Sequence, residues 1–446
     1  MYLDEYKRWL AADLEDADLK PELSKIEGND EEIKDRFAVA LKFGTAGLRG
    51  VLGAGTNRMN IYVVRQATQG LANWVKTQGG SQTVAISYDS RLKSDVFAKT
   101  AAGVLAANGI KVRIYDALMP VPALSFATRY YECNAGIMVT ASHNPAKYNG
   151  YKAYGPDGCQ MTDDAAAIVY DEIQKTDVLT GAKYISFAAG VEQGLIRFVG
   201  DDCKKALYDA IEARQVRPGL CRTAGLKLVY SPLNGSGLVP VTHVLNDMGI
   251  TDITIVPEQE YPNGYFTTCS YPNPEIFEAL KLGLDLATKT GADLMLATDP
   301  DADRVGIAMK CPDGSYELVA GERRLRACKM AKMQTIPAIL CDYADDKTAA
   351  MGLLENLQRE NLNPFEQAQG LRDVMVLWDC TQAEAAKRLG MAQPTLANKL
   401  RLLQLTQDQR QFVLDNGLTE RHARAVLRLP ENRRSEALIT LSLIHI

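Results

Sequence analysis

The alternation of short apolar, β-branched segments with amphipathic helical ones restricts the fold of residues 1–320 more than any other feature of the sequence. Residues 83–88 and 111–115 are predicted strands, and residues 95–107 between them are a predicted helix that ends at Asn108-Gly109. Strands and helices that alternate in this way build a mainly parallel sheet covered by helices. The sequence therefore predicts an α/β fold for this part of the chain.

A second α/β domain is predicted after residues 214–224, a basic, proline-containing stretch that we interpret as a boundary. Beyond this stretch, residues 226–230 and 293–298 have the apolar character of strands, and residues 275–290 have the pattern of a helix. We therefore expect two domains, at residues 1–213 and 214–320.

The distribution of charge divides the chain near residue 320. With 446 residues, of which 46% are hydrophobic, the chain can bury several cores. Residues 1–320 contain 32 Lys+Arg and 40 Asp+Glu, a net charge of -8, whereas residues 321–446 contain 18 and 15, a net charge of +3. This asymmetry indicates two modules with different partners.

The cysteines and the N-terminus predict a soluble protein of the reducing cytoplasm. The nine cysteines are scattered and include no CxxC pair, which disfavours both a disulfide framework and a zinc knuckle. The first residues are charged rather than apolar, unlike a signal peptide, and no stretch approaches the about 18 apolar residues of a membrane span. We therefore expect no membrane partner.

A candidate nucleophile follows the predicted strand at residues 136–140. The chain passes directly from this strand into Ser142-His-Asn-Pro145, and open α/β sheets place their chemistry at the carboxyl ends of strands. Lys152 offers a positive charge to a phosphate or, if its pKa is lowered, a proton shuttle. The alternative is that Ser142 only forms a local turn or a helix cap.

A candidate metal site follows the predicted strand at residues 293–298. Three aspartates alternate there, namely Asp299, Asp301 and Asp303. A tight loop can direct their oxygens at one hard cation, and Mg²⁺ is the cation that suits a phosphoryl site. A calcium EF-hand is excluded, because Arg304 and Lys310 stand where that loop needs Gly and Glu. The alternative is a solvated acidic turn.

These motifs occur with others in an order and spacing that resemble the phosphohexomutases. The others are Phe43-Gly-Thr-Ala-Gly-Leu-Arg49, Tyr88-Asp-Ser-Arg91 and Asn149-Gly-Tyr-Lys152. On these five motifs, residues 1–320 resemble a bacterial phosphoglucomutase/phosphomannomutase. The resemblance implies transfer of a phosphoryl group between C1 and C6 of a hexose phosphate, with a hexose 1,6-bisphosphate as primer.

The resemblance also implies a role for each residue. Ser142 would hold the phosphoryl group, and Mg²⁺ would lie on Asp299, Asp301, Asp303 and the Ser142 phosphate. His143 and Lys152 would be the general acid and base, and Arg49 and Arg304 would bind phosphate, for which their planar guanidinium groups are suited. Asp89 and Arg91 would order the neighbouring loop.

The mutase resemblance ends near residue 320. Phosphohexomutases continue into a third domain with a sugar-reading Gly-Glu-x-Ser-Gly-His loop and a fourth with a phosphate-binding loop, and neither string occurs in this sequence. We therefore expect impaired turnover. The sequence does not distinguish a glucose from a mannose substrate.

From residue 316 the sequence resembles the ParB family of chromosome-partition and nucleoid-occlusion proteins. The matching strings are residues 321–327 (GERRLRA), 355–359 (ENLQR) and 381–405. The first two strings belong to a CTP-binding fold in that family, which implies as nucleotide-binding positions Gly321, Glu322, Arg323, Arg324, Glu355, Asn356 and Arg359. Mutase-like sequence stands where the first nucleotide box should be, which argues against CTP binding. We expect a partial nucleotide-binding segment at 321–363, a DNA-binding domain at 364–437 and an unassigned tail at 438–446.

Residues 381–403 predict a helix-turn-helix independently of that resemblance. Thr381 can cap a helix with Glu384 three residues later, Gly390 can form the turn, and Pro394 suits the start of the second helix. Ala385, Leu389, Leu396, Leu400 and Leu403 would form the buried seam. The second helix would then present side chains that contact bases or phosphates, namely Gln393, Thr395, Asn398, Lys399 and Arg401. The alternative is an ordinary helical hairpin.

Two hypotheses of different classes follow from the sequence. The first is a Mg²⁺-dependent phosphohexomutase that retains its phosphoserine and metal motifs. The second is a sequence-specific DNA-binding protein of the ParB type, which would bind a palindromic site. The change of resemblance within a Tyr-Glu-Leu-Val strand that ends in Gly321 indicates a chimera in which two genes are joined.

Overall fold

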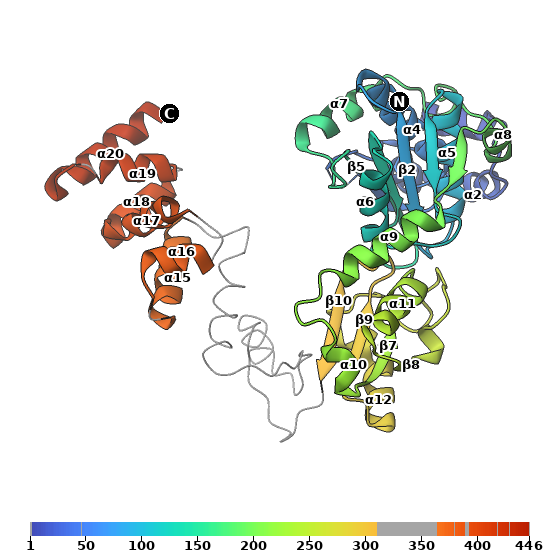
Figure 1. The fold of residues 1–446 in the computed structure, drawn as a ribbon. Coiled ribbons are helices and arrows are strands. Elements are labelled where there is room, and N and C mark those ends of the chain that lie inside the picture. The colour runs from blue at the N-terminus through green and yellow to red at the C-terminus, as the bar shows by residue number, and fades with distance from the viewer. Residues whose placement is uncertain are drawn as a thin grey trace. The chain divides into compact units, whose positions relative to one another are not determined.

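The computed structural model describes residues 2–45, 47–309, 364–378, 380–388, 392–416, 418–427 and 429–445. It contains two compact units, one built from the residues up to Lys310 and one that contains the helices from Pro364 onward (Figure 1). The GERRLRA and ENLQR strings, and the strand at which the two resemblances meet, lie outside the described residues.

The first α/β domain contains a six-stranded sheet in the order β1-β5-β4-β2-β3-β6. Its strands are β1 (Leu48–Val51), β2 (Thr83–Tyr88), β3 (Lys111–Ile114), β4 (Ala135–Val139), β5 (Tyr148–Tyr154) and β6 (Ile196–Phe198). Strands β4, β2, β3 and β6 are parallel, which confirms the mainly parallel sheet, whereas β5 runs antiparallel to both β4 and β1. The sequence did not predict β1 or β5 as strands, and β5 is the strand on which Lys152 lies.

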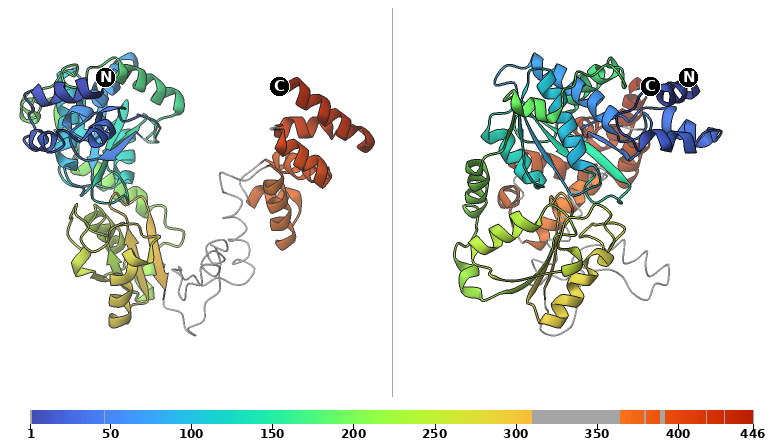
Figure 2. Two further views of the ribbon diagram at one scale, coloured as in Figure 1. Left: turned by 180° about the vertical axis from the view of Figure 1, so that it is seen from behind. Right: turned by 90° about the vertical axis from the view of Figure 1, so that its right-hand side faces the viewer.

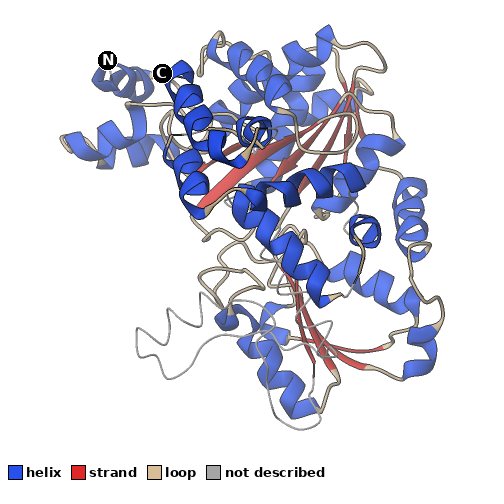
Figure 3. Ribbon diagram, turned by 90° about the vertical axis from the view of Figure 1, so that its left-hand side faces the viewer, coloured by secondary structure: helices blue, strands red, loops and turns tan. Residues whose placement is uncertain are grey.

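Helices cover both faces of this sheet (Figure 3). They are α1 (Tyr2–Ala11), α2 (Leu19–Lys25), α3 (Asp30–Phe37), α4 (Ile61–Thr77), α5 (Ser94–Ala107), α6 (Val121–Tyr130), α7 (Asp163–Gln174), α8 (Phe187–Glu192) and α9 (Asp201–Glu212). Alternate residues of β2 point to opposite faces, so Ile86 packs in one core with Phe97 of α5, and Ala85 packs in the other with Leu124 of α6. The sheet is therefore buried between two helical layers.

The second α/β domain contains a four-stranded sheet in the order β10-β9-β7-β8 (Figure 1). Figure 2 shows this domain, coloured green to yellow, in two further views. Its elements are α10 (Leu220–Ala224), β7 (Lys227–Ser231), α11 (Leu238–Met248), β8 (Asp252–Ile255), η1 (Pro257–Gln259), α12 (Phe277–Thr290), β9 (Leu294–Thr298) and β10 (Val305–Met309). Strands β8, β7 and β9 are parallel, and β10 returns antiparallel to β9. The aspartate loop is thus the connection that leaves the carboxyl end of β9 and enters β10.

The C-terminal unit is helical. Its elements are α15 (Pro364–Leu377), α16 (Gln382–Arg388), α17 (Gln393–Arg401), η2 (Leu402–Gln404), α18 (Gln407–Asp415), α19 (Glu420–Val426) and α20 (Glu431–His445). Thr381 and Glu384 cap α16 as predicted, because the Glu384 amide donates to Thr381 Oγ1 and the Thr381 amide donates to Glu384 Oε2. Ala385 and Leu396 of the predicted seam are fully buried.

Helix α20 continues through the segment that the sequence left unassigned. Leu438 is buried in the same core as Phe365 of α15, and Leu441 packs against that core. Residues 438–445 therefore belong to a helix that packs through Leu438 and Leu441. Among the described residues, no helix is long and apolar enough to cross a membrane.

Candidate active site at the meeting of the serine and aspartate loops

Ser142 occupies a strained position directly after β4. It is 4% exposed, and its φ of +52° lies in the left-handed region that residues other than glycine rarely adopt. Arg91, which is fully buried, holds the loop in this conformation. Its Nε donates to the Ser142 carbonyl at 3.1 Å, its Nη1 donates to the carbonyls of Pro145 and Tyr148 at 3.1 Å each, and its Nη2 donates to those of Ser142 and Asn144. One guanidinium thus fixes the carbonyl of the candidate nucleophile and the backbone that follows it.

The Ser142 hydroxyl joins the two predicted motifs. Its Oγ lies 2.9 Å from Oδ2 of Asp299 in the second domain and 3.1 Å from Nδ1 of His143. Sequence reasoning expected the alcohol and the acids to meet in this way, although they are 157 residues apart.

The aspartate loop has the geometry of a cation site. One carboxylate oxygen from each of Asp299, Asp301 and Asp303 lies within 4.8 Å of the others, and the first two residues are fully buried. Among the described residues, Asp301 Oδ1 is one of the few buried side-chain atoms without a hydrogen-bond partner. Burial raises the pKa of Asp299, and the negative charge of Asp301 raises it further. Buried carboxylates at this separation repel one another, so the cluster fits a divalent cation such as Mg²⁺.

Lys152 lies beside these acids on β5. Its Nζ is 2.8 Å from Oδ2 of Asp301 and 3.4 Å from Oδ2 of Asp303. Burial by itself lowers the pKa of Lys152, but the two carboxylates outweigh burial and the net pKa is raised. Of the two roles considered for Lys152, this direction favours a fixed positive charge over a proton shuttle with a lowered pKa.

His143 is favoured in its neutral form. Burial lowers the pKa of its imidazole, and the positive charges of Arg304 and Arg49 lower it further. Arg304 is anchored at the surface, where its Nη1 lies 2.8 Å from Oε1 of Glu275. Glu275 was not predicted from the sequence, where no local motif pairs it with an arginine 29 residues away. Arg49 lies on β1, at the edge of the first sheet.

The predicted DNA-contacting residues differ in their exposure. Gln393, Thr395 and Arg401 are exposed, but Asn398 is only partly exposed. The Lys399 ammonium donates to Gln367 Oε1 at 2.8 Å and lies 3.5 Å from Oε2 of Glu420. Lys399 is therefore bound within its own unit, which the sequence did not predict. The seven nucleotide-binding positions implied by the ParB resemblance lie outside the described residues.

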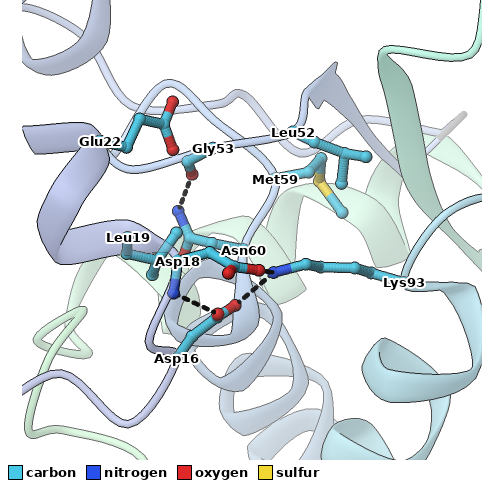
Figure 4. Close-up of a pocket in the computed structure, with 9 residues that line it drawn as sticks. All are labelled: Asp16, Asp18, Leu19, Glu22, Leu52, Gly53, Met59, Asn60 and Lys93. Carbon is cyan, nitrogen blue, oxygen red and sulfur yellow. Dashed lines mark hydrogen bonds and ion pairs between the residues drawn. The ribbon is translucent and has the colours of Figure 1, made fainter. Parts of the chain in front are cut away.

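A small cavity of about 180 Å³ lies apart from these residues (Figure 4). Its lining includes Asp16, Asp18, Glu22, Asn60 and Lys93. The Lys93 ammonium bonds to Asp16 at 2.8 Å and to Asp18 at 3.0 Å, so the charges in this cavity are paired. None of the residues that line it was predicted as a site residue.

The N-terminal part is thus an α/β protein in which a buried serine near the end of a strand faces an aspartate cluster that fits a divalent cation. Two models of a single family match it: domain I of phosphoglucomutase/phosphomannomutase at residues 40–179 and domain II at residues 206–314. This part of the chain belongs to the phosphoglucomutase/phosphomannomutase family. The C-terminal part matches the ParB N-terminal domain at residues 307–357 and the ParB helix-turn-helix domain at residues 360–443, so the chain is a chimera of the two families.

Individual relatives of the N-terminal part agree with its family match. A phosphoglucomutase from Staphylococcus saprophyticus is 36% identical over 292 residues, which cover 66% of this chain and 52% of the relative. A phosphomannomutase-type structure from Thermus thermophilus is 26% identical with a TM-score of 0.52, and the match covers 61% of this chain and 57% of that one. The ParB protein of Caulobacter crescentus, solved with its centromeric parS site, is 30% identical over 30% of this chain and 73% of that one, with a TM-score of 0.25. The chain spans about half the length of the phosphoglucomutase relative.

Proposed function

We propose that the N-terminal part is a phosphohexomutase-type phosphotransferase that works through a phosphoserine at Ser142. The observation that supports this proposal is the 2.9 Å approach of Ser142 Oγ to Asp299 inside the carboxylate cluster. A serine that only formed a turn would have no reason to be buried against three acids of another domain, where desolvation is costly. A solvated acidic turn does not fit either, since Asp299 and Asp301 are fully buried.

Each residue has a role in the proposed transfer. Ser142 Oγ attacks the phosphorus of a hexose 1,6-bisphosphate, and the Ser142 proton passes to the neutral His143, whose Nδ1 lies 3.1 Å away. The phosphorus–oxygen bond to the sugar breaks, and the hexose monophosphate leaves after its oxygen takes a proton back from His143. Arg49 and Arg304 bind phosphate oxygens, and the Lys152 ammonium holds Asp301 in place. A Mg²⁺ held by Asp299, Asp301, Asp303 and the Ser142 oxygen would offset the negative charge of the phosphoryl group.

We propose that turnover of this chain is impaired even though serine phosphorylation persists. The family's sugar-reading and distal phosphate-binding strings are not present in the sequence, so the residues that orient the hexose for the second transfer are missing. Little conversion of glucose 1-phosphate to glucose 6-phosphate is expected, even with primer and Mg²⁺. Turnover comparable to that of a full-length relative would contradict this part of the proposal.

Intact mass spectrometry tests the phosphoserine directly. The purified chain is treated with glucose 1,6-bisphosphate and Mg²⁺, and a mass increase of one phosphoryl group is expected. Ser142→Ala should abolish the increase, whereas Ser24→Ala, a change at an exposed serine of α2, should retain it. Persistence of the increase in the Ser142→Ala variant would show that another group is modified.

A second function is supported by the capped helix pair α16–α17 within the ParB helix-turn-helix match. We propose that α17 contacts a palindromic DNA site through Gln393, Thr395 and Arg401, which are exposed. A gel shift with a palindromic and a scrambled duplex, at low and moderate salt, tests this function. Equal binding to both duplexes would refute sequence-specific recognition.

Two further expectations remain proposals. We expect weak or no CTP binding, because mutase-like sequence replaces the first nucleotide box, and isothermal titration with CTP tests this. We also propose a cytoplasmic location, because the cysteines are scattered along the sequence and include no CxxC pair.

A further inference from the structure

Thr140 connects the serine loop, the metal loop and the end of β2 through one buried hydroxyl. The residue follows β4, two positions before Ser142, and is 1% exposed. We propose that this hydroxyl is a positioning group for phosphoryl transfer, which sets the Ser142 backbone and the Asp301 carboxylate relative to each other. The inference rests on the proposed phosphoserine function and extends it to a residue that does not contact the substrate.

Three contacts converge on Thr140 Oγ1. The Ser142 amide donates to it at 2.7 Å, and it lies 2.6 Å from Oδ2 of Asp89 and 3.1 Å from Oδ2 of Asp301. A threonine hydroxyl has one hydrogen to donate and two lone pairs to accept with. It can therefore accept from the Ser142 amide and donate to only one of the two carboxylates at a time.

The shorter contact identifies Asp89 as the partner that receives this hydrogen. Asp89 is itself fixed, because its Oδ1 accepts from the Arg91 amide at 3.0 Å and from Ser94 Oγ at 2.8 Å. The Asp301 Oδ2 atom then has Lys152 Nζ at 2.8 Å as its donor. Thr140 is thus held by the rigid end of the first sheet and limits how closely Asp301 can approach the serine loop.

The Ser142 amide contact explains the left-handed backbone of the nucleophile. A serine at a φ of +52° is unfavourable unless its surroundings fix it. Arg91 holds the carbonyl side of the loop, and Thr140 Oγ1 holds the amide side. Loss of the hydroxyl would leave the Ser142 amide without this acceptor and release Ser142 Oγ from its place beside Asp299.

Valine and serine at position 140 separate the hydroxyl from the shape of the side chain. Thr140→Val keeps the branched shape and removes the hydroxyl, and Thr140→Ser keeps the hydroxyl and removes a methyl group. Thr128→Val is the matched control, because Thr128 is also fully buried and bonds only a backbone carbonyl of its own helix, that of Leu124 at 2.8 Å.

The first measurement is the rate of Ser142 phosphorylation by glucose 1,6-bisphosphate with Mg²⁺, followed by intact mass. Thr140→Val should slow it by about 10- to 100-fold, since a displacement of about 1 Å in a reacting group can cost about 100-fold. Thr140→Ser should restore the rate to within about threefold, because only a rotamer constraint is lost. Thr128→Val should match the wild type. A Thr140→Val rate equal to that of the wild type overturns the inference.

The second measurement does not depend on transfer. Hydrogen exchange of the Ser142 amide should be faster in Thr140→Val than in the wild type, and should return toward the wild-type rate in Thr140→Ser. Unchanged exchange in Thr140→Val also overturns the inference. If the wild type itself acquires no phosphoryl group, the proposed function fails, and exchange alone decides whether Thr140 holds the nucleophile loop.

Discussion

Arg91→Met should destabilise the N-terminal unit more than any other single replacement of a cation outside the metal site. The Arg91 and Asp89 side chains are both fully buried, with Nε 3.5 Å from Oδ2, and the guanidinium also donates to four backbone carbonyls. Removing one partner of a buried ion pair costs about 3–5 kcal/mol, because the other charge remains buried without compensation. Carbonyls that lose their donor add to this cost. We therefore expect a loss of about 3–5 kcal/mol in the free energy of unfolding.

The pH dependence of this variant has a definite sign. Burial raises the pKa of Asp89, and the positive charge of Arg91 opposes that rise. Without Arg91 the native carboxyl should hold its proton to a higher pH, while the unfolded chain releases it near the ordinary value. Between these two pKa values the native state binds more protons than the unfolded state. The free energy of unfolding should therefore fall as the pH rises from the ordinary pKa of an aspartate to the raised pKa of native Asp89, more steeply than in the wild type.

Urea unfolding of the full chain, followed by far-UV circular dichroism between pH 5 and pH 8, measures both effects. Arg113→Met is the control, because Arg113 contacts the ring of Tyr131 at 4.7 Å and such a contact contributes only about 0.5–1 kcal/mol. The double variant Asp89→Asn/Arg91→Met should lose less than the sum of the single changes. A loss below about 1 kcal/mol for Arg91→Met would refute the argument, since it would mean that the loop does not depend on this ion pair.

Three further changes test other parts of the structure. Asp299→Asn should change the melting temperature measured in EDTA only slightly, because the raised pKa of Asp299 already keeps this carboxyl uncharged when no cation is bound. It should reduce the stabilisation by Mg²⁺, which for a site filled at 100 times its Kd is about 2.7 kcal/mol; an unchanged Mg²⁺ response by differential scanning fluorimetry would argue against the cation site. Arg304→Met should raise the pKa of His143, since it removes a nearby positive charge. NMR titration of the His143 ring would detect this change, with Ser142→Ala measured for comparison. A pKa that stays the same or falls would show that the charge of Arg304 does not lower the pKa of His143. Lys399→Ala should cost about 0.5–1 kcal/mol in unfolding free energy through loss of its contacts to Gln367 and Glu420. Arg401→Ala should leave the stability unchanged and weaken DNA binding in a gel shift. A loss of stability in Arg401→Ala and a loss of DNA binding in Lys399→Ala would overturn the assignment of the two side chains.

The two families overlap at residues 307–314, which the domain II model and the ParB N-terminal model both match. The overlap begins within β10, the last described strand of the N-terminal unit. The sequence predicted a join slightly later, at a strand that ends in Gly321, in a segment outside the described residues. Both placements agree that the change of family occurs where the two families share a similar sequence. A continuous reading frame across residues 300–330 in an independent clone is expected if one gene encodes both parts.

The two α/β domains, the motif residues and the cap of α16 could be predicted from the sequence, because each depends on neighbours along the chain. Strand–helix alternation fixes the fold class, and Thr381 reaches Glu384 within one helical turn. The strand β5 was missed, since its glycine-containing sequence resembles a turn and it becomes a strand only by pairing with β1 and β4.

The contacts between distant groups could not be predicted from the sequence and depend on the folded arrangement of the chain. The approach of Ser142 to Asp299, the anchoring of Lys152 by Asp301 and the binding of Lys399 within its own unit all join residues that are far apart in sequence. The direction of the Lys152 pKa shift was open for the same reason, because burial and two neighbouring carboxylates act in opposite senses and only their geometry decides which prevails. Local patterns identify candidate groups, but charge and reactivity depend on the atoms that folding places around them.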